Sequence, residues 1–413
     1  MTTTQRETVA DGTWQPGLAL AVLTANFALL GMTIGTQGVV WAEVMPRLGL
    51  TSGVFGTAQL LAPLVSIGVL LLGGRLAARV GGRRLAVASL AGLALGSLVL
   101  GWSTSLAGLL GALVLFGIGN GLFEIAMNGA ALDWEHAQRR HVLNGLHAGY
   151  SGGAAIGAVA AGALLGLGWT YLQVLTLVAG VAGLLAVVTL RTRFPPGETV
   201  TPTLPSPPSG SPRVRGDEGD KLADDLSATV RLLVSHRVLV ALALIAMLGS
   251  VGESVANLWS VILLRERGAD AVLGGATFAL LNGAMMLGRL FNAPLVARWG
   301  ARASLTVSGL GLVLTTVLLL APGGLWLAVL GFVLLGVAVA GFVPTVLTAG
   351  ARLAPGQSGA LAGAMLAAVY ASFVVAPPLV GWLAELFSLQ AALALLGVCG
   401  VAVLALTRQV HTP

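Results

Sequence analysis

Charged residues are scarce in this chain. Only 9% of its 413 residues are Asp, Glu, Lys or Arg, while 56% are hydrophobic. A soluble domain carries about 25% charged residues, so this scarcity excludes an ordinary water-soluble domain. The formal net charge of +6 comes from arginines that stand singly or in pairs between apolar runs. Because they do not gather on one face, the charge does not indicate a nucleic-acid-binding protein.

Cysteine is almost absent as well. The single Cys399 lies in an apolar stretch, so there is no disulfide framework, and we expect it to be a small apolar helix residue. The chain also lacks a phosphate-binding glycine loop with lysine, a cluster of metal ligands and a nucleophile triad. We therefore expect no enzymatic activity, no metal and no cofactor.

Long apolar runs fill most of the sequence. The segment from Met1 to Trp14 is polar and lacks the features of a cleaved signal peptide, so we expect the first apolar run to remain in the membrane. A membrane-spanning helix needs about 20 apolar residues. The 58 glycines fit such helices, because small residues let membrane helices approach closely. We predict an all-α membrane protein with twelve transmembrane helices at 17–42, 53–77, 84–102, 105–132, 141–166, 168–190, 238–264, 272–296, 303–321, 325–350, 358–384 and 389–407.

Basic residues favour one set of loops. The loops on the opposite side hold only Arg47, Arg265 and Arg267. The positive-inside rule therefore predicts that both termini lie in the cytoplasm, and we expect a multi-pass protein of a bacterial-type inner membrane. The favoured loops, which follow the second, fourth, eighth and tenth helices, hold Arg79, Arg83, Arg84, Arg139, Arg140, Arg298, Arg302 and Arg352.

The two halves of the chain repeat each other. The segment LAARVGGR at 76–83 matches LVARWGAR at 295–302, and we call the shift that brings Leu76 onto Leu295 the repeat offset. Between the sixth and seventh helices lies a long break rich in Pro, Ser and Gly, the composition of a disordered linker. Two parallel six-helix repeats place a binding site between them at mid-membrane. The predicted parts are an N-terminal six-helix bundle at 1–190, a cytoplasmic linker at 191–237 and a C-terminal six-helix bundle at 238–413.

Few acidic residues lie inside the predicted helices. Of 16 acids, only Glu124 and Glu253 are far from a helix end. A charge at mid-membrane costs at least about 2.5–3.5 kcal/mol. A carboxylic acid avoids this cost by binding a proton, and it ionises again when water reaches it, which couples proton movement to alternating access. We expect Glu124, Glu253 and His147 to take part in proton coupling, although hydrogen bonds between helices are the alternative role.

Polar residues recur at helical spacing beside these acids. Asn120, Glu124 and Asn128 form one stripe of the fourth predicted helix. Such stripes fit a small hydroxylated or zwitterionic solute held by convergent hydrogen bonds, while bonding of helix to helix is the alternative. Arg289 lies deep in its helix, so we expect its side chain to pair either with an acid or with an anionic group of a substrate. The expected solute-binding residues are Asn26, Thr33, Gln37, Asn120, Asn128, Asn144, Asn257, Asn282 and Arg289.

The segment GRLAARVGGRR at 74–84 resembles the loop 2–3 signature of the major facilitator superfamily. In that family an Asp, which pairs with arginines to lock the cytoplasmic gate, commonly stands at the position of Ala78. Ala297 fills the equivalent place in the second half. The resemblance implies gating roles for four of the arginines in these two segments, namely Arg79, Arg83, Arg84 and Arg298.

Two further segments narrow this resemblance. GNGLFEIAMN at 119–128 and LNGLHAGYSGG at 143–153 are similar to helices 4 and 5 of the fucose:proton symporter family. Glu124 stands where that family has its proton-coupling Glu, whereas Glu43 is one residue away from the position of the family's helix 1 acid. The second half resembles an orphan bacterial branch of the same group, the YbjJ-like transporters, at Glu253, Trp259, Ser260, Gly288, Arg289, Pro344, Pro377 and Pro378.

Together these features predict a secondary active transporter that moves a small polar organic solute by proton symport with alternating access. A sugar is one candidate solute. The alternatives are a proton-coupled efflux antiporter of drugs or metabolites and a transporter-like substrate sensor. The Gly-Pro of the antiporter signature is missing, since Ala158 follows Gly157, and no cytoplasmic signalling domain supports a sensor. The expected partners are the solute, protons and the lipid bilayer, and we expect a monomer.

Overall fold

The computed structural model describes residues 15–195, 236–353 and 358–410, and all regular structure in these ranges is helical. Eleven helical segments in the described ranges are long and apolar enough to cross a membrane. The predicted all-α architecture is therefore confirmed. Most of the predicted linker at 191–237 lies outside the described residues.

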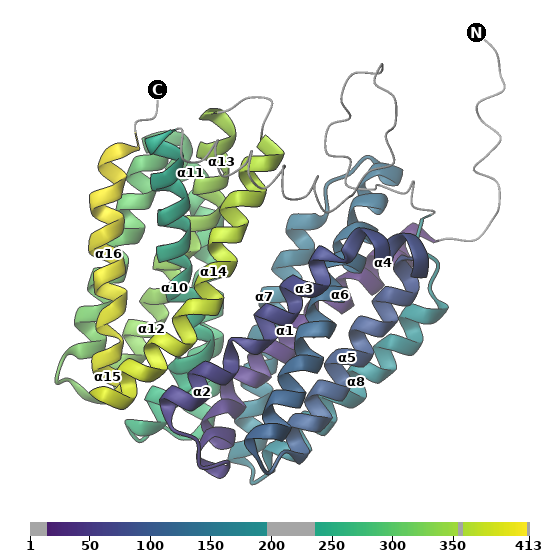
Figure 1. The fold of residues 1–413 in the computed structure, drawn as a ribbon, viewed down its shortest axis with the longest axis horizontal. Helices are drawn as coiled ribbons and strands as arrows, with labels where there is room; N and C mark the ends of the chain where they lie inside the picture. The colour runs from purple at the N-terminus through teal and green to yellow at the C-terminus, as the bar shows by residue number, and fades with distance from the viewer. Residues whose placement is uncertain (1–14, 196–235, 354–357, 411–413) are drawn as a thin grey trace, which may run out of the picture.

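The helices form two groups, which Figure 1 shows next to each other, with the start of α1 and the end of α16 at the same end of the molecule. The first group, here called the N-terminal bundle, contains α1 (Pro16–Arg47), α2 (Ser52–Gln59), α3 (Leu61–Leu71), α4 (Gly73–Val80), α5 (Gly82–Trp102), α6 (Leu106–Gln138), α7 (Leu143–Gly166) and α8 (Tyr171–Arg191). The second, here called the C-terminal bundle, contains α10 (Arg237–Glu266), α11 (Ala271–Leu320), α12 (Gly324–Ala340), α13 (Phe342–Leu353), α14 (Ser358–Leu386), α15 (Leu389–Ala392), α16 (Ala394–Leu406) and the 3-10 turn η1 (Thr407–Gln409).

The difference between eleven segments and the twelve predicted helices arises in α11. This element is 50 residues long and contains two helices that meet at Gly300, whose φ is 80° and ψ is 168°. The predicted helices at 272–296 and 303–321 correspond to its two parts. The repeat offset brings Gly81 onto Gly300, and Gly81 has φ 83° and ψ 144° between α4 and α5. Only glycine adopts such angles without strain, so the same residue type turns the chain at both positions.

Two other predicted helices are interrupted. The predicted helix at 53–77 is divided into α2, α3 and part of α4, and the one at 325–350 is divided into α12 and α13. Both segments stay apolar across their breaks. Ser52–Leu71 and Gly324–Leu353 are each long and apolar enough to span a membrane. Hydropathy therefore located these segments and did not reveal their internal breaks.

Glycine packing also recurs at the repeat offset. A Cβ atom on Gly117 of α6 would meet the backbone oxygen of Ala62 at 2.6 Å. A Cβ atom on Gly336 of α12 would meet the backbone oxygen of Leu281 in the same way. The offset that brings Gly117 onto Gly336 also brings Ala62 onto Leu281, so the two contacts are equivalent in the two halves.

Several helices that begin at the end away from the start of α1 have polar residues at their N-caps. The side chains of Thr51, Ser105, Asp270 and Ser388 each accept a hydrogen bond from the backbone N–H three residues on. These bonds satisfy donors that the first helical turn leaves free. Cys399 lies in the last long helix, where its thiol is buried in α16.

Candidate functional site

A cavity of about 440 Å³ lies between the two bundles. Its walls come from α1, α2, α3, α5, α6 and α7 on one side and from α10, α11 and α14 on the other. Polar and aromatic side chains share the lining, which is typical of sites for small molecules. The polar and ionisable side chains at the wall are Thr33, Gln37, Gln59, Ser66, Asn120, Glu124, His147, Tyr150, Glu253, Ser254, Asn257, Arg289 and Tyr370.

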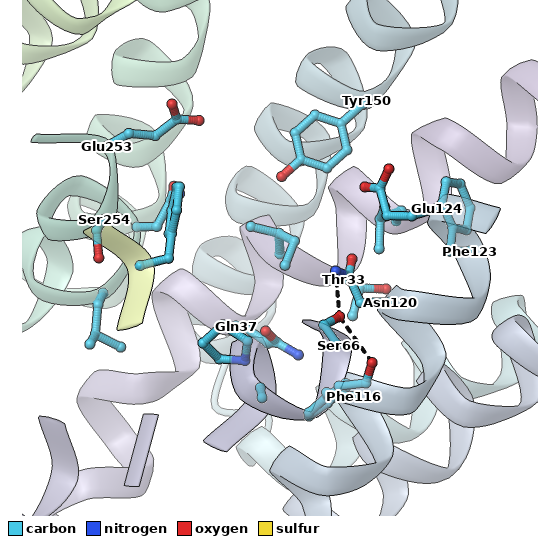
Figure 2. Close-up of a pocket in the computed structure, with 18 of the residues that line it drawn as sticks. Thr33, Gln37, Ser66, Phe116, Asn120, Phe123, Glu124, Tyr150, Glu253 and Ser254 are labelled. Carbon is cyan, nitrogen blue, oxygen red and sulfur yellow. Dashed lines mark hydrogen bonds between the residues drawn. The ribbon is translucent and has the colours of Figure 1, made fainter. Parts of the chain in front are cut away.

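The wall formed by the N-terminal bundle has an ordered chain of hydrogen bonds. The Nδ2 of Asn120 donates to the Oγ of Ser66 over 3.1 Å, and Ser66 donates in turn to the backbone oxygen of Gly117 over 3.0 Å. Figure 2 shows Asn120 and Ser66 side by side, with dashed lines for the bonds. One turn further along α6, Glu124 accepts a hydrogen bond of 2.6 Å from Asn128. These bonds hold α3 and α6 together and fix where the amide and the acid face the cavity.

The wall formed by the C-terminal bundle contains two opposite charges. Nη2 of Arg289, on α11, lies 3.8 Å from Oε1 of Glu253, on α10. Both side chains line the cavity and remain partly exposed, at 38% for Arg289 and 23% for Glu253. At this distance the two groups attract each other without a hydrogen bond.

Tyr150 of α7 lies between the charged groups of the two walls. In Figure 2 its ring stands between Glu253 on the left and Glu124 on the right, and its hydroxyl points into the intervening space. The polar stripes did not single out Tyr150 or Tyr370, because aromatic residues are also expected in apolar helices. Their rarity was a usable signal, since two of the three tyrosines in the chain line the cavity.

The structure brings most of the expected site residues to one place. The members that line the cavity are Thr33, Gln37, Asn120, Glu124, His147, Glu253, Asn257 and Arg289. Asn128 reaches the site through its bond to Glu124. The side chain of Asn144 lies outside the described part of the structure.

Two expected solute-binding residues lie elsewhere. Asn26 is buried and donates to the backbone oxygen of Val22 and to the Oγ1 of Thr189, so it joins α1 to α8. Asn282 is buried and donates to the backbone oxygen of Phe278 within its own helix. In both cases the amide satisfies its hydrogen bonds inside a bundle.

The four arginines expected at the gate lie at one end of the molecule. All four are exposed, and they stand in α4, at the start of α5 and in α11 just before Gly300. The start of α1 and the end of α16 lie at this same end in Figure 1. The residues concerned are Arg79, Arg83, Arg84 and Arg298.

At the opposite end the two bundles are in direct contact. Nη2 of Arg265 on α10 lies 2.8 Å from Oε1 of Glu43 on α1. Oε2 of Glu385 on α14 accepts a hydrogen bond of 3.0 Å from the backbone N–H of Gly53 on α2. Glu43 is therefore part of a contact between the bundles, at a distance from the cavity wall. We refer to this region as the closed end.

Glycines allow close backbone contact at the closed end. A Cβ atom on Gly275 of α11 would meet the backbone oxygen of Ala158 on α7, and Gly162 lies directly opposite. Gly56 and Gly381 make a similar contact between α2 and α14, each against a backbone oxygen of the other helix. The bundles thus approach one another with little side chain between them.

Comparison with known proteins identifies relatives along nearly the whole chain. The family model described as the Major Facilitator Superfamily matches residues 22–355. An uncharacterized transporter of Sinorhizobium fredii, y4wD, is 27% identical over 391 residues, which cover 93% of this chain and 96% of that protein.

Two solved structures share the fold. A variant of the nucleoside transporter NupG has a TM-score of 0.80 at 13% identity, with 95% of this chain and 100% of that chain covered. A D-xylose-proton symporter has a TM-score of 0.70 at 14% identity, with 96% of this chain and 99% of that chain covered. At these identities the likeness concerns the fold alone.

Proposed function

The chain belongs to the major facilitator superfamily, and from this premise we propose that it moves a small polar organic solute across a membrane by proton symport with alternating access. Members of the family are transporters and not enzymes, which agrees with the absence of catalytic motifs from the sequence. The observation that carries the proposal is Glu124, an acid at the wall of a cavity that both bundles enclose.

The proposed architecture has twelve membrane crossings in two six-helix repeats, at 1–190 and 238–413, joined by a cytoplasmic linker at 191–237. The turn at Gly300 supports this count, because it divides α11 as Gly81 separates α4 from α5. The matched glycine contacts at the repeat offset support the repeat. The excess of arginine at the end near the start of α1 supports a cytoplasmic position for both termini, in an inner membrane of the bacterial type.

Glu124 is suited to bind the transported proton. An ionised acid in the membrane interior costs at least about 2.5 kcal/mol, whereas the protonated acid is neutral. We expect Glu124 to be protonated when the cavity is closed and to release its proton when water enters from the cytoplasm. Glu253 and His147 line the same cavity and are further candidates for the proton path.

The cavity favours a polar solute with a ring. Amide and hydroxyl groups from Gln37, Asn120 and Asn257 supply hydrogen bonds, while Trp41 and Phe373 offer apolar faces. The names of the structural neighbours, a nucleoside transporter and a D-xylose-proton symporter, describe solutes of this kind. A sugar remains a candidate, in line with the resemblance to the fucose:proton symporter family and its YbjJ-like branch.

Under this proposal, the described arrangement is the state that opens toward the cytoplasm. Contacts such as Glu43–Arg265 join the bundles at the closed end, which the proposed topology assigns to the outer side. In the opposite state these contacts separate, and the exposed arginines at the cytoplasmic end become the gate. We propose this gating role for Arg79, Arg83, Arg84 and Arg298.

The test is solute-driven proton entry into vesicles that contain the purified protein. Addition of a transported solute outside should acidify the lumen, and Glu124→Gln should reduce this signal at least about tenfold, a change of about 1.4 kcal/mol. Glu266→Gln is the matched control, because Glu266 is an exposed acid at the far end of α10. It should retain the signal.

The direction of proton flow separates the proposal from its rivals. Proton exit during solute uptake would indicate an antiporter and overturn the proposed symport. Solute binding without flux of any solute would indicate a sensor. Equal acidification by the wild type and Glu124→Gln would remove Glu124 from the proton path.

A further inference from the structure

The pair of charges in the cavity has an unusual geometry. Arg289 and Glu253 lie 3.8 Å apart at their closest atoms, and no hydrogen bond to the guanidinium is found among the described residues. By contrast, Arg265 and Glu43 at the closed end are in hydrogen-bond contact at 2.8 Å. An arginine has five N–H donors in a planar fork. Most of the donors of Arg289 are therefore available to the cavity.

A purely structural pair in this position is expected to be tighter. Removing two charges from water is repaid only by good geometry and by further hydrogen bonds. Arg289 lies nine residues before Arg298 in α11, roughly 13 Å of helix rise, so it does not reach the end of the helix easily. Its side chain is 38% exposed and lines the cavity. The guanidinium thus lacks the acceptor oxygens that such a site requires.

A second cavity residue also presents an unpaired donor. The Nε2 atom of Gln59 is buried at the cavity wall and has no hydrogen-bond partner in the described structure. Gln59 belongs to α2, in the bundle opposite Arg289. Donors on two walls favour a ligand with acceptor oxygens at both ends, one of them charged.

From these observations we propose that the transported solute is a small organic monoanion, whose carboxylate or similar acid group binds Arg289. This inference rests on the proposed symport and names its substrate class. Glu253 holds the guanidinium at the cavity wall without occupying its fork. The planar fork fits a carboxylate through two parallel hydrogen bonds.

The charges of the cavity give this inference a measurable consequence. The titratable groups that face one another there are Glu124, His147 and Tyr150 from the N-terminal bundle and Glu253, Arg289 and Tyr370 from the C-terminal bundle. With Glu124 ionised and no solute, Glu253, Arg289 and Glu124 sum to one negative charge. With a proton on Glu124 and a monoanion on Arg289, the sum is the same. One proton and one monoanion therefore cross together without net charge movement.

The experiment compares acids with neutral molecules of matched shape in vesicles that contain the full chain. The pairs are D-glucuronate and D-glucose, nicotinate and nicotinamide, and L-lactate and propane-1,2-diol. We expect the acid of at least one pair to enter at least about tenfold faster than its neutral partner. Its uptake should follow an imposed pH gradient and should not respond to a potassium diffusion potential set with valinomycin.

Variants of two arginines test the assignment. Arg289→Gln should reduce uptake of that acid at least about tenfold, and Arg289→Lys should restore only part of it, since lysine keeps the charge and loses the fork. Arg408→Gln is the control, because Arg408 is exposed in η1 and does not belong to the cavity lining or to the proposed gate. It should transport the acid as the wild type does.

Three outcomes would contradict the monoanion class or the role of Arg289. If a neutral partner enters together with protons and its uptake responds to the potential, the solute is not a monoanion. The proposed symport then remains intact. Full uptake of the acid by Arg289→Gln overturns the role of Arg289. Absence of uptake for all three acids overturns the inference, whereas the proposed symport is still decided by its own test with other polar solutes.

Discussion

Single polar side chains in these helices have two different uses. Asn120 and Glu124 face the cavity, whereas Asn26 and Asn282 complete hydrogen bonds inside a bundle. Glu135 shows a further structural use. Its Oε1 accepts hydrogen bonds from the backbone N–H groups of Val142 and Leu143, at 2.5 and 2.9 Å. The first turn of α7 has no cap from its own N-cap residue, so the cap comes from the end of α6.

Glu135→Ala should therefore destabilise the start of α7. Loss of a helix cap costs about 1 kcal/mol, so we expect a Tm lower by a few degrees for the purified protein. Glu135→Gln keeps one acceptor oxygen and should lose less. His136→Ala, at an exposed neighbouring position, is the control and should leave the Tm unchanged. Equal stability of the alanine variant and the wild type would contradict the capping role.

At this scale the sequence grouped several polar residues that the structure brings to one cavity, and their roles there remain predictions. Helical spacing grouped Asn120 with Glu124, and both line the cavity. The same reasoning did not distinguish Asn26 from the residues that line the cavity. In a helix with apolar residues on every side, the sequence does not show which face meets the cavity. Tyr150 was missed for a related reason, since an aromatic ring fits an apolar helix equally well.

Among the helices, the contact of α1 with α7 depends on glycine. Cβ atoms on Gly31 and Gly35 would meet the backbone of Tyr150 and Ala154, and those on Gly153 and Gly157 would meet the backbone of α1. The two helices thus lie almost backbone to backbone, as small residues spaced by four permit. This close contact also fixes Tyr150 and His147 of α7 against α1 at the cavity wall.

Gly153→Leu should disrupt this pair of helices. Overpacking of a tight contact costs about 1–3 kcal/mol, so the variant should have a lower Tm and a smaller yield of monodisperse protein. Gly152→Leu is the matched control, because a Cβ on Gly152 has nothing within 4 Å. Similar losses for the two variants would show that the contact with α1 is not the cause.

The elements themselves were largely predictable from hydropathy and turn residues. The apolar runs located all the segments long enough to span a membrane. The breaks after Gln59 and at Gly341 were not predicted, since a short break leaves the mean hydropathy of a segment unchanged. The high glycine content predicted close helix contacts, yet it did not indicate which helices make them.

For the whole molecule, the closed end determines which side of the cavity is shut. Gly275 of α11 faces Gly162 and Ala158 of α7 there, and the Glu43–Arg265 pair lies at the same end. Under the proposed mechanism these contacts form and separate once per cycle. The internal repeat predicted that two halves face one another, but sequence spacing gave no information about which end of them touches.

Gly275→Leu should weaken the closed arrangement selectively. An overpacking cost of about 1–3 kcal/mol on one state alone lowers its population about fivefold or more, and we expect solute uptake to fall accordingly. Gly283→Leu on the same helix is the control, because a Cβ on Gly283 has nothing within 4 Å. The yield and Tm of Gly275→Leu should stay near those of the control. Wild-type uptake by Gly275→Leu would contradict a cycle that passes through this contact.

The burial of the single cysteine in α16 has a practical consequence. Cys399 is 3% exposed and is the one thiol in the 413-residue chain. A cysteine introduced at Gln37 in the cavity, or at Thr57 near the closed end, is therefore the accessible target for a maleimide that does not cross lipid. When the reagent is added to one side of the membrane, the labelling rate of the introduced cysteine shows whether water reaches it from that side. The wild-type chain already serves as a labelling background, so the motion of the protein can be followed without first replacing Cys399.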